Sequence, residues 1–147
     1  MVEVNGNIWT RYCQPDEFIV ITTNNILTHK GLVMGAGIAL AAKDRCPWLP
    51  EYWATKIGQH GIDYHILAAP NNLIALQTKR HYKDHSPISL IEASLEALAA
   101  KMTEDFPSFT INMPRPCCGN GGLDWDTQVK PICERICKGN KWIIWNH

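Results

Sequence analysis

Short apolar runs alternate with helical segments along the chain, and this alternation restricts the fold more than any other feature. Runs rich in β-branched and other apolar residues predict strands at residues 1–9, 17–23, 64–69, 73–79, 108–113 and 141–146. Segments of good helix formers predict helices at residues 38–45, 50–61, 87–105 and 125–139. Strands that alternate with helices in this way are typical of a sheet covered by helices on both faces. We therefore expect a single α/β sandwich.

Breaker residues set the expected ends of the helices. Pro47 follows the first helix, Gly61 is expected to stop the second, and Gly139 is expected to cap the last. Pro87 lies near the first turn of the longest helix. Pro131 falls inside the last helix, where a proline either kinks the helix or marks its true start.

Length and charge limit the class of protein. A chain of 147 residues is typical of one domain. The 14 Lys and Arg residues balance the 14 Asp and Glu residues, which disfavours a strongly cationic nucleic-acid or membrane-surface protein but allows a local basic patch. The first residues lack the pattern of a signal peptide, and no apolar run approaches the roughly 18 residues that span a membrane. We expect a soluble, cytoplasmic protein.

The cysteines do not form a metal-binding pattern. They occur at positions 13, 46, 117, 118, 133 and 137, with no CxxC pair and no regular spacing. Cys133 and Cys137 are four residues apart and can share a helical face, but no His or second Cys pair near them completes a tetrahedral zinc site. We expect reduced cysteines and no metal.

Two glycine-rich stretches, GLVMGAGIAL at residues 31–40 and GNGGLDW at residues 119–125, lie between a predicted strand and a predicted helix. Ligands of α/β sheets bind at this edge, beyond the carboxyl ends of the strands. Loops without side chains let a ligand approach backbone amides, and a helix start adds positive partial charge, so the pair of loops can clamp a diphosphate. Alternatively, the glycines only permit turns and close packing. The distance of GAGIAL from its strand argues against a Rossmann dinucleotide site.

The segment QTKRHYKDH at residues 77–85 gathers cations at the end of a predicted apolar strand. A solvated basic loop is the plain interpretation of such a run. Its position at the ligand edge supports a second interpretation, in which Lys79, partly desolvated beside Arg80 and Lys83, acts as an amine nucleophile towards a sugar carbon.

Five motifs follow one another along nearly the whole chain. They are GNI at residues 6–8, Asn24-Asn25, VMGAGIAL, TKRHYKD and MPRPCCGNGGLDW. Together they resemble a macro domain, the α/β/α module that binds ADP-ribose. They are most similar to the branch of terminal ADP-ribose glycohydrolase and the DNA ADP-ribosyl glycohydrolase antitoxins, in which MGxGIA, TKRHW-like and MPRxGCGxxxLxW segments recur in this order. The resemblance implies a three-layer α/β/α sandwich with a mixed central sheet, in a single domain over residues 1–147.

The resemblance also assigns roles to residues. It implies that Lys79 is catalytic, that residues 33–38 line the distal ribose and the phosphates, and that residues 118–122 hold the diphosphate from the other side. The adenine is expected against Asn7 and Ile8. The full set expected to contact ADP-ribose is Asn7, Ile8, Asn24, Asn25, Val33, Met34, Gly35, Ala36, Gly37, Ile38, Pro114, Cys118, Gly119, Asn120, Gly121, Gly122 and Leu123. The residues expected to contact flanking nucleotides are Arg80, His81, Lys83 and His85.

Three positions depart from the family pattern. Asn7 stands where the family places an aspartate, so an amide oxygen replaces the carboxylate that accepts from the adenine amino group. Gly121 stands where the eukaryotic enzyme carries a catalytic aspartate, which favours the DNA-directed branch. Cys117 stands where the branch usually has glycine, and the sequence offers no reason for it beyond tolerance of a small residue.

The expected function is that of an ADP-ribosyl glycohydrolase, which removes ADP-ribose from nucleobases in DNA, or from protein, with Lys79 at the distal ribose. Two alternatives stay open: a reader that binds ADP-ribose without turnover, and a hydrolase of ADP-ribose-1″-phosphate or O-acetyl-ADP-ribose. No cofactor is expected besides ADP-ribose as ligand and product. The expected protein partner, where one exists, is a cognate ADP-ribosyltransferase toxin.

Overall fold

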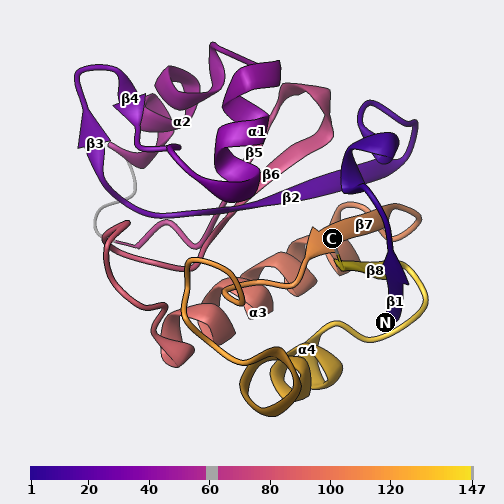
Figure 1. Ribbon diagram of the computed structural model, residues 1–147. Coiled ribbons are helices and arrows are strands. Elements are labelled where there is room, and N and C mark those ends of the chain that lie inside the picture. The colour runs from indigo at the N-terminus through magenta and orange to yellow at the C-terminus, as the bar shows by residue number, and fades with distance from the viewer. Residues whose placement is uncertain (59–62, 147) are drawn as a thin grey trace.

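A computed structural model describes residues 1–58 and 63–146 and shows a six-stranded sheet between two layers of helices (Figure 1). The strands are β1 (Val2–Asn5), β2 (Glu17–Thr23), β5 (Ile66–Ala69), β6 (Leu73–Gln77), β7 (Thr110–Pro114) and β8 (Trp142–Asn146). Their order across the sheet is β1-β8-β7-β2-β6-β5. Every pair of neighbours is parallel except β5 and β6, which are antiparallel. The mixed sheet confirms the predicted α/β/α architecture.

Two helices cover each face of the sheet. Helices α1 (Gly37–Arg45) and α2 (Leu49–Ile57) pack on one face, and α3 (Ile88–Glu104) and α4 (Lys130–Ile136) pack on the other (Figure 1). Shorter elements are the 3-10 turns η1 (Ile8–Arg11) and η2 (Pro70–Asn72), the π-helical turn η3 (Trp125–Val129), and the hairpin of β3 (Leu27–Thr28) and β4 (Gly31–Leu32). None of the helices in the described residues is both long and apolar enough to cross a bilayer.

The protein has a hydrophobic core on each face of the sheet, and the central strand β2 contributes side chains to both. Because successive side chains of a strand point to opposite faces, Phe18 and Val20 join the core under α3 and α4, whereas Ile19 and Ile21 join the core under α1 and α2. The spacing of apolar residues over 87–105 predicts a buried stripe of Ile88, Ile91, Leu95 and Leu98. The last three lie on the buried face of α3 with Leu90 and Met102, whereas Ile88 is 41% exposed, so its prediction was wrong.

The N-terminal strand is shorter than predicted. It ends at Asn5, and η1 follows because the Asn7 side chain caps the turn by accepting a hydrogen bond from the Trp9 backbone N–H at 3.0 Å. Likewise β6 ends at Gln77, two residues before the predicted end of that strand.

Helix ends also differ from the predictions at three places. Helix α2 ends at Ile57 with Gly58 at its C-cap, and Gly61 lies outside the described residues. Pro131 lies in the first turn of α4, after the π-helical turn η3, so it marks a helix start rather than a kink. Gly139 does not cap α4, because the helix ends at Ile136; its φ of +98° instead serves the turn into β8.

The parallel strands all direct their carboxyl ends to one edge of the sheet. The residues that follow them include Gly6 after β1, Asn24 after β2, Thr78 after β6 and Arg115 after β7. Parallel α/β sheets bind ligands at this edge. The ends of the five parallel strands, which are far apart in the sequence, therefore lie together at one edge of the sheet.

Candidate functional site

A cleft of about 1440 Å³ lies at this edge of the sheet. Its lining includes residues at the ends of all five parallel strands and on both glycine loops. Thirteen of the predicted site residues line it: Asn7, Ile8, Asn24, Val33, Gly35, Ala36, Gly37, Ile38, Lys79, Pro114, Gly119, Asn120 and Gly121. The structure therefore joins most of the residues that were expected to meet one ligand.

The remaining predicted residues lie outside the cleft lining. Met34 is 2% exposed and belongs to the core under α1 and α2, so its side chain faces away from any ligand. The others that do not line the cleft are Asn25, Cys118, Gly122, Leu123, Arg80, His81, Lys83 and His85. The last three of these form an exposed or half-exposed turn together with Tyr82.

Asn24 holds the first glycine loop at the end of β2. Its Nδ2 donates to the Val33 carbonyl at 2.9 Å, and its Oδ1 accepts from the Ile26 N–H at 2.9 Å. The loop then enters α1 at Gly37, so the free N–H groups of the first helical turn lie at the cleft. Such a helix start favours an anionic group.

Packing explains some of the loop glycines but not others. A Cβ at Gly31 would lie 2.5 Å from the carbonyl carbon of Pro50, and one at Gly122 would lie 2.9 Å from the His85 ring. By contrast, a Cβ at Gly35 or Gly119 would meet nothing within 4 Å, and neither residue has a positive φ. At these two positions neither the turn nor the packing requires glycine, which leaves open access to the backbone as the reason.

Gly121 has no room for any side chain. Its Cβ would lie 2.5 Å from the carbonyl oxygen of Cys117 and 2.7 Å from Ser86 Oγ. The catalytic aspartate that a related enzyme carries at this position therefore cannot be accommodated by the loop as it stands. Cys117 itself has a φ of +68°, the left-handed region that glycine adopts most readily, which agrees with the glycine that the resemblance implies at this position.

We expect Gly121→Ala to lower the free energy of unfolding by about 1–3 kcal/mol, because the added methyl group overlaps backbone that cannot move freely. Gly119→Ala is the control in the same loop, since its methyl group enters open space. Denaturant unfolding of both variants checks the prediction. Equal stability of the two would contradict the close contact at Gly121.

The two glycine loops face each other across the cleft. A Cβ at Gly37 would lie 3.7 Å from Nδ2 of Asn120, so the start of α1 and the second loop approach within side-chain contact. The first loop comes from the α1 side of the sheet, and the second connects β7 to the α4 side (Figure 1). A diphosphate between them would meet backbone from both sides.

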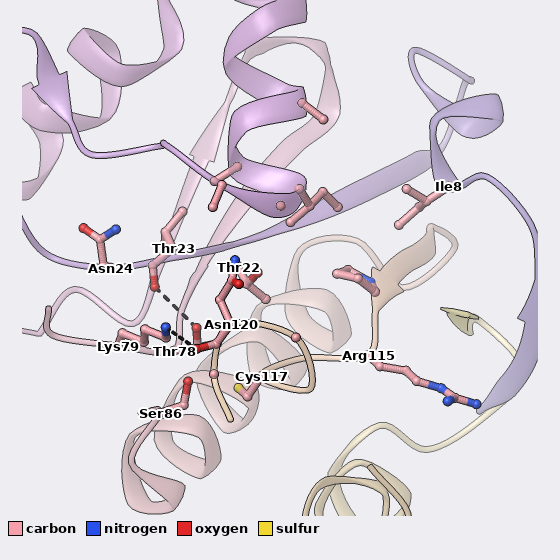
Figure 2. A pocket seen from close by; sticks show the side chains of 18 of the residues that line it. Ile8, Thr22, Thr23, Asn24, Thr78, Lys79, Ser86, Arg115, Cys117 and Asn120 are labelled. Carbon is pink, nitrogen blue, oxygen red and sulfur yellow. Dashed lines mark hydrogen bonds between the residues drawn. The ribbon is translucent and has the colours of Figure 1, made fainter. Parts of the chain in front are cut away.

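Lys79 lies at one end of the cleft and is 8% exposed. The backbone N–H groups of Thr78 and Lys79 both donate to the Thr23 carbonyl, at 3.0 and 3.3 Å, which fixes the lysine against the end of β2. Its Nζ donates to the Asn120 carbonyl at 2.7 Å and to the Tyr82 carbonyl at 3.3 Å. Figure 2 shows the amine directed towards Asn120 on the second glycine loop.

Arg80 and Lys83, the cations near Lys79 in the sequence, do not line the cleft with it. Arg80 forms an ion pair with Asp63, with 2.8 Å between Nη2 and Oδ2, and the guanidinium holds the pKa of that carboxyl below its usual range. The expectation that Arg80 crowds the Lys79 amine is therefore wrong, because its charge is turned to Asp63 outside the cleft lining. Lys83 is exposed on the following turn.

Aromatic and apolar side chains form the other end of the cleft. Ile8, Trp9 and Trp145 line it there, and the Arg45 guanidinium lies 4.2 Å from the centroid of the Trp9 ring. The Trp145 ring is held by its Nε1, which donates to Oδ1 of the buried Asn112 at 2.9 Å. This end of the cleft offers a flat apolar surface suited to an aromatic base.

Sequence analysis missed several residues of the cleft. They are Gly6, Trp9, Thr22, Thr23, Ala39, Ala41, Thr78, Tyr82, Ser86, Arg115, Cys117 and Trp145. Thr22, Thr23 and Thr78 stand at the ends of predicted strands next to residues that were chosen, so their position was a usable signal. The sequence held no such signal for Trp145 and Ser86, because only the strand order and the path of the chain bring them to the cleft.

The two thiols near the cleft, of which Cys117 is buried and Cys118 half-buried, both have raised pKa values. Burial raises the pKa of Cys117 to about 12, and the nearby Ser86 hydroxyl lowers this pKa only in part. Burial likewise raises the pKa of Cys118 to about 11. In the described part of the chain, no group of three or more His, Cys, Asp or Glu side chains is arranged to hold a metal ion.

Comparison with known proteins connects this geometry to a class. No protein-family model matches the chain. The chain is 33% identical over 102 residues to the DNA ADP-ribosyl glycohydrolase of Mycobacterium tuberculosis, a match that covers 64% of the chain and 29% of that protein. It is 30% identical over 141 residues to the DNA ADP-ribosyl glycohydrolase of Thermus aquaticus, with 90% and 37% covered. The chain thus matches about a third of the length of these relatives.

Solved structures show the same fold. The macrodomain of Thermus aquaticus DarG matches with a TM-score of 0.73 and 25% identity, over 98% of the chain and 95% of that structure. Thermosipho africanus DarTG, solved in complex with ADP-ribose, matches with a TM-score of 0.75 and 20% identity, over 98% of the chain and 41% of that structure. The chain is therefore a macro domain, as its motifs predicted. In sequence and in structure it resembles the macro domains of DarG, the DNA ADP-ribosyl glycohydrolases.

Proposed function

We propose that the protein is a glycohydrolase that removes ADP-ribose from nucleobases in DNA. The observation that carries the proposal is Lys79, a residue that is 8% exposed and whose amine donates to two carbonyls at one end of the cleft. The named activity of the relatives and the ADP-ribose complex of a protein with the same fold support it.

The cleft offers matching surfaces for the parts of ADP-ribose. The adenine is assigned to the end with Ile8, Trp9 and Trp145, and the diphosphate to the space between the two glycine loops. The distal ribose then lies beside Lys79. Backbone N–H groups of the two loops suit the charged diphosphate, and the apolar surface at the other end suits the base.

The charged groups of the lining favour a lysine mechanism. In the described chain the cleft is lined by two cations, Lys79 and Arg115, and by no carboxylate. Arg115 is directed away from Lys79 and lies 3.6 Å from Glu3 (Figure 2). The lining in the described residues therefore lacks the paired carboxylates that most glycosidases use, and Lys79 is the cation placed to act on the distal ribose.

Two chemical roles fit the geometry of the Lys79 amine. As a neutral amine it uses both N–H groups on the Asn120 and Tyr82 carbonyls and keeps its lone pair for C1″ of the ribose. Attack there forms a bond between Nζ and C1″ and breaks the bond from C1″ to the base, which leaves with a proton from the amine. Opening of the bond from C1″ to the ring oxygen then gives a Schiff base, and water releases ADP-ribose from it and restores the amine. As an ammonium group it keeps a third N–H, which stabilises the charge that develops on the leaving base.

One assay tests the proposed function. The protein is incubated with an ADP-ribosylated single-stranded oligonucleotide, an ADP-ribosylated protein and ADP-ribose-1″-phosphate, and the release of ADP-ribose is followed by chromatography. We expect release from the oligonucleotide at the highest kcat/KM. Tight ADP-ribose binding without any release would instead identify a reader, and turnover of the phosphate alone would identify a hydrolase of small derivatives.

We expect Asn7→Asp to hold or improve ADP-ribose affinity, by on the order of 1 kcal/mol if the hydrogen bond to the adenine amino group becomes charge-assisted. The Oδ1 of Asn7 already accepts from the Trp9 N–H, and an aspartate caps that turn equally well. Calorimetry measures the change, and a tenfold loss of affinity would show that the adenine lies elsewhere.

The resemblance further predicts that a cognate ADP-ribosyltransferase supplies the substrate. Mixing the protein with such a transferase and an oligonucleotide tests this expectation, since the modified base is then made and removed in one reaction.

A further inference from the structure

Tyr82 is a cleft residue whose side chain also reaches the solvent. It lines the cleft, yet it is 43% exposed, and it is one of few large apolar side chains in the described chain that reach the solvent to this extent. The ring of His81 is stacked on it, with 4.3 Å between the ring centroids and 29° between the planes. An exposed aromatic pair at the mouth of a ligand cleft offers a flat face to whatever enters.

The aromatic pair is held in place by a tight turn. The Lys83 N–H donates to His81 Nδ1 at 3.1 Å, and the Asp84 N–H donates to the His81 carbonyl at 3.1 Å. These bonds orient the imidazole ring on the turn. Rigid aromatic surfaces bind with little loss of conformational entropy.

The turn is also attached at both ends to the second glycine loop. Lys79 Nζ reaches the Asn120 carbonyl before the turn, and the Ser86 N–H donates to the Gly121 carbonyl at 3.1 Å after it. The backbone of the turn that carries Tyr82 is therefore attached to Lys79 and to the diphosphate loop.

The position of Tyr82 relative to Lys79 determines which part of a bound substrate the Tyr82 ring can contact. The Tyr82 carbonyl accepts from Lys79 Nζ at 3.3 Å, so the residue that carries the ring also touches the amine. In the proposed reaction C1″ of the distal ribose lies beside that amine. The group attached to C1″ is then the part of the substrate that leaves the cleft past the Tyr82 ring.

We propose that Tyr82, backed by His81, stacks on the nucleobase that carries the ADP-ribose, and so selects a base in single-stranded nucleic acid as the leaving group. This inference rests on the proposed function and names the substrate class of the same site. Every base has a π face that an aromatic side chain can stack on, whereas aliphatic and carboxylate side chains of proteins have none of comparable size. In a duplex both faces of the base are covered by its neighbours, so only an unstacked base fits.

Charge on the turn agrees with this partner. Lys83 Nζ lies 6.0 Å from the centroid of the Tyr82 ring, and Lys83 is exposed. A cation beside a stacking platform is the arrangement that proteins use along a single strand, where it meets the phosphates next to the stacked base.

Binding to a variant that cannot turn over provides the test. In a Lys79→Ala background, Tyr82→Leu and Tyr82→Phe are compared for affinity to free ADP-ribose and to a single-stranded oligonucleotide that carries ADP-ribose on one base. We expect Tyr82→Leu to weaken oligonucleotide binding about tenfold or more and ADP-ribose binding less than twofold. Tyr82→Phe keeps the ring and should match the parent for both ligands.

Trp48→Ala is the matched control, because Trp48 is 40% exposed, is aromatic and does not line the cleft. It should bind both ligands like the parent. Unchanged oligonucleotide affinity in Tyr82→Leu overturns the proposal, and so does an equal loss for free ADP-ribose, which would mean that Tyr82 only shapes the ADP-ribose cleft. The proposed function fails separately, if the wild-type protein releases ADP-ribose from no oligonucleotide. The binding comparison decides the stacking role in that case as well.

Discussion

Lys79→Ala is expected to lower kcat on an ADP-ribosylated oligonucleotide by at least about 10²-fold, while ADP-ribose affinity changes only a few-fold. The amine lies at the end of the cleft and is bound to the carbonyls of Asn120 and Tyr82. Both roles available to it, nucleophile and hydrogen-bond donor, act on the transition state and not on the bound ADP-ribose. Loss of such a group lowers kcat far more than it weakens ground-state binding.

Arg80→Ala is the control for this experiment. Arg80 neighbours Lys79 in sequence, but its guanidinium is bound to Asp63 outside the cleft lining. Removing one exposed charge of this kind costs at most a few-fold. If Arg80→Ala lost as much activity as Lys79→Ala, the general charge of the segment would matter and not the Lys79 amine.

Borohydride trapping separates the two roles of the lysine. Only a Schiff base between Nζ and C1″ leaves a reduced ADP-ribose adduct on Lys79, which mass spectrometry detects. An amine that acts as a donor leaves none, although its removal still lowers kcat. A Lys79→Ala protein that cleaves every ADP-ribosylated substrate at the wild-type rate would exclude both roles, and the reader or the hydrolase of small derivatives would then be the better description.

The sequence predicts the layers of the fold well, because each depends on local patterns. The apolar run of residues 17–23 is the central strand, and the apolar stripe of residues 87–105 is the buried face of α3. The ends of elements are less predictable, since they depend on hydrogen bonds made by individual side chains. Asn7 ends the first strand early by capping η1, and no periodicity announces such a cap.

The residues of the site, like the elements of the fold, could be predicted from the sequence only in part. The glycine loops and Lys79 belong to short continuous motifs, so the sequence was sufficient to select them. Trp145 and Ser86 reach the cleft through the strand order and through the turn that follows Lys79. The role of Arg80 was misjudged for a related reason, because its partner Asp63 lies seventeen residues away in the chain and cannot be paired with it from spacing.

Gly119→Val is expected to abolish ADP-ribose binding while the protein stays folded. A Cβ at Gly119 would meet nothing within 4 Å, and the residue has no positive φ, so neither the backbone nor a Cβ contact opposes a side chain there. Its methyl groups would then occupy the open space of the cleft, where the proposed diphosphate approaches the backbone. If the backbone at Gly119 did not meet the ligand, this substitution would leave ADP-ribose affinity nearly unchanged, so the position distinguishes the two interpretations of the loops.

Gly37→Val and Gly58→Val complete the comparison. Gly37 has a φ of +56° and faces Asn120, so valine adds backbone strain to the steric block and should also abolish binding. Gly58 has a φ of −57° at the C-cap of α2, outside the cleft lining, and the same substitution there should leave ADP-ribose affinity unchanged. Calorimetry measures the affinities, and circular dichroism checks that each variant is folded. Wild-type affinity in Gly119→Val would mean that the diphosphate does not lie between the two loops.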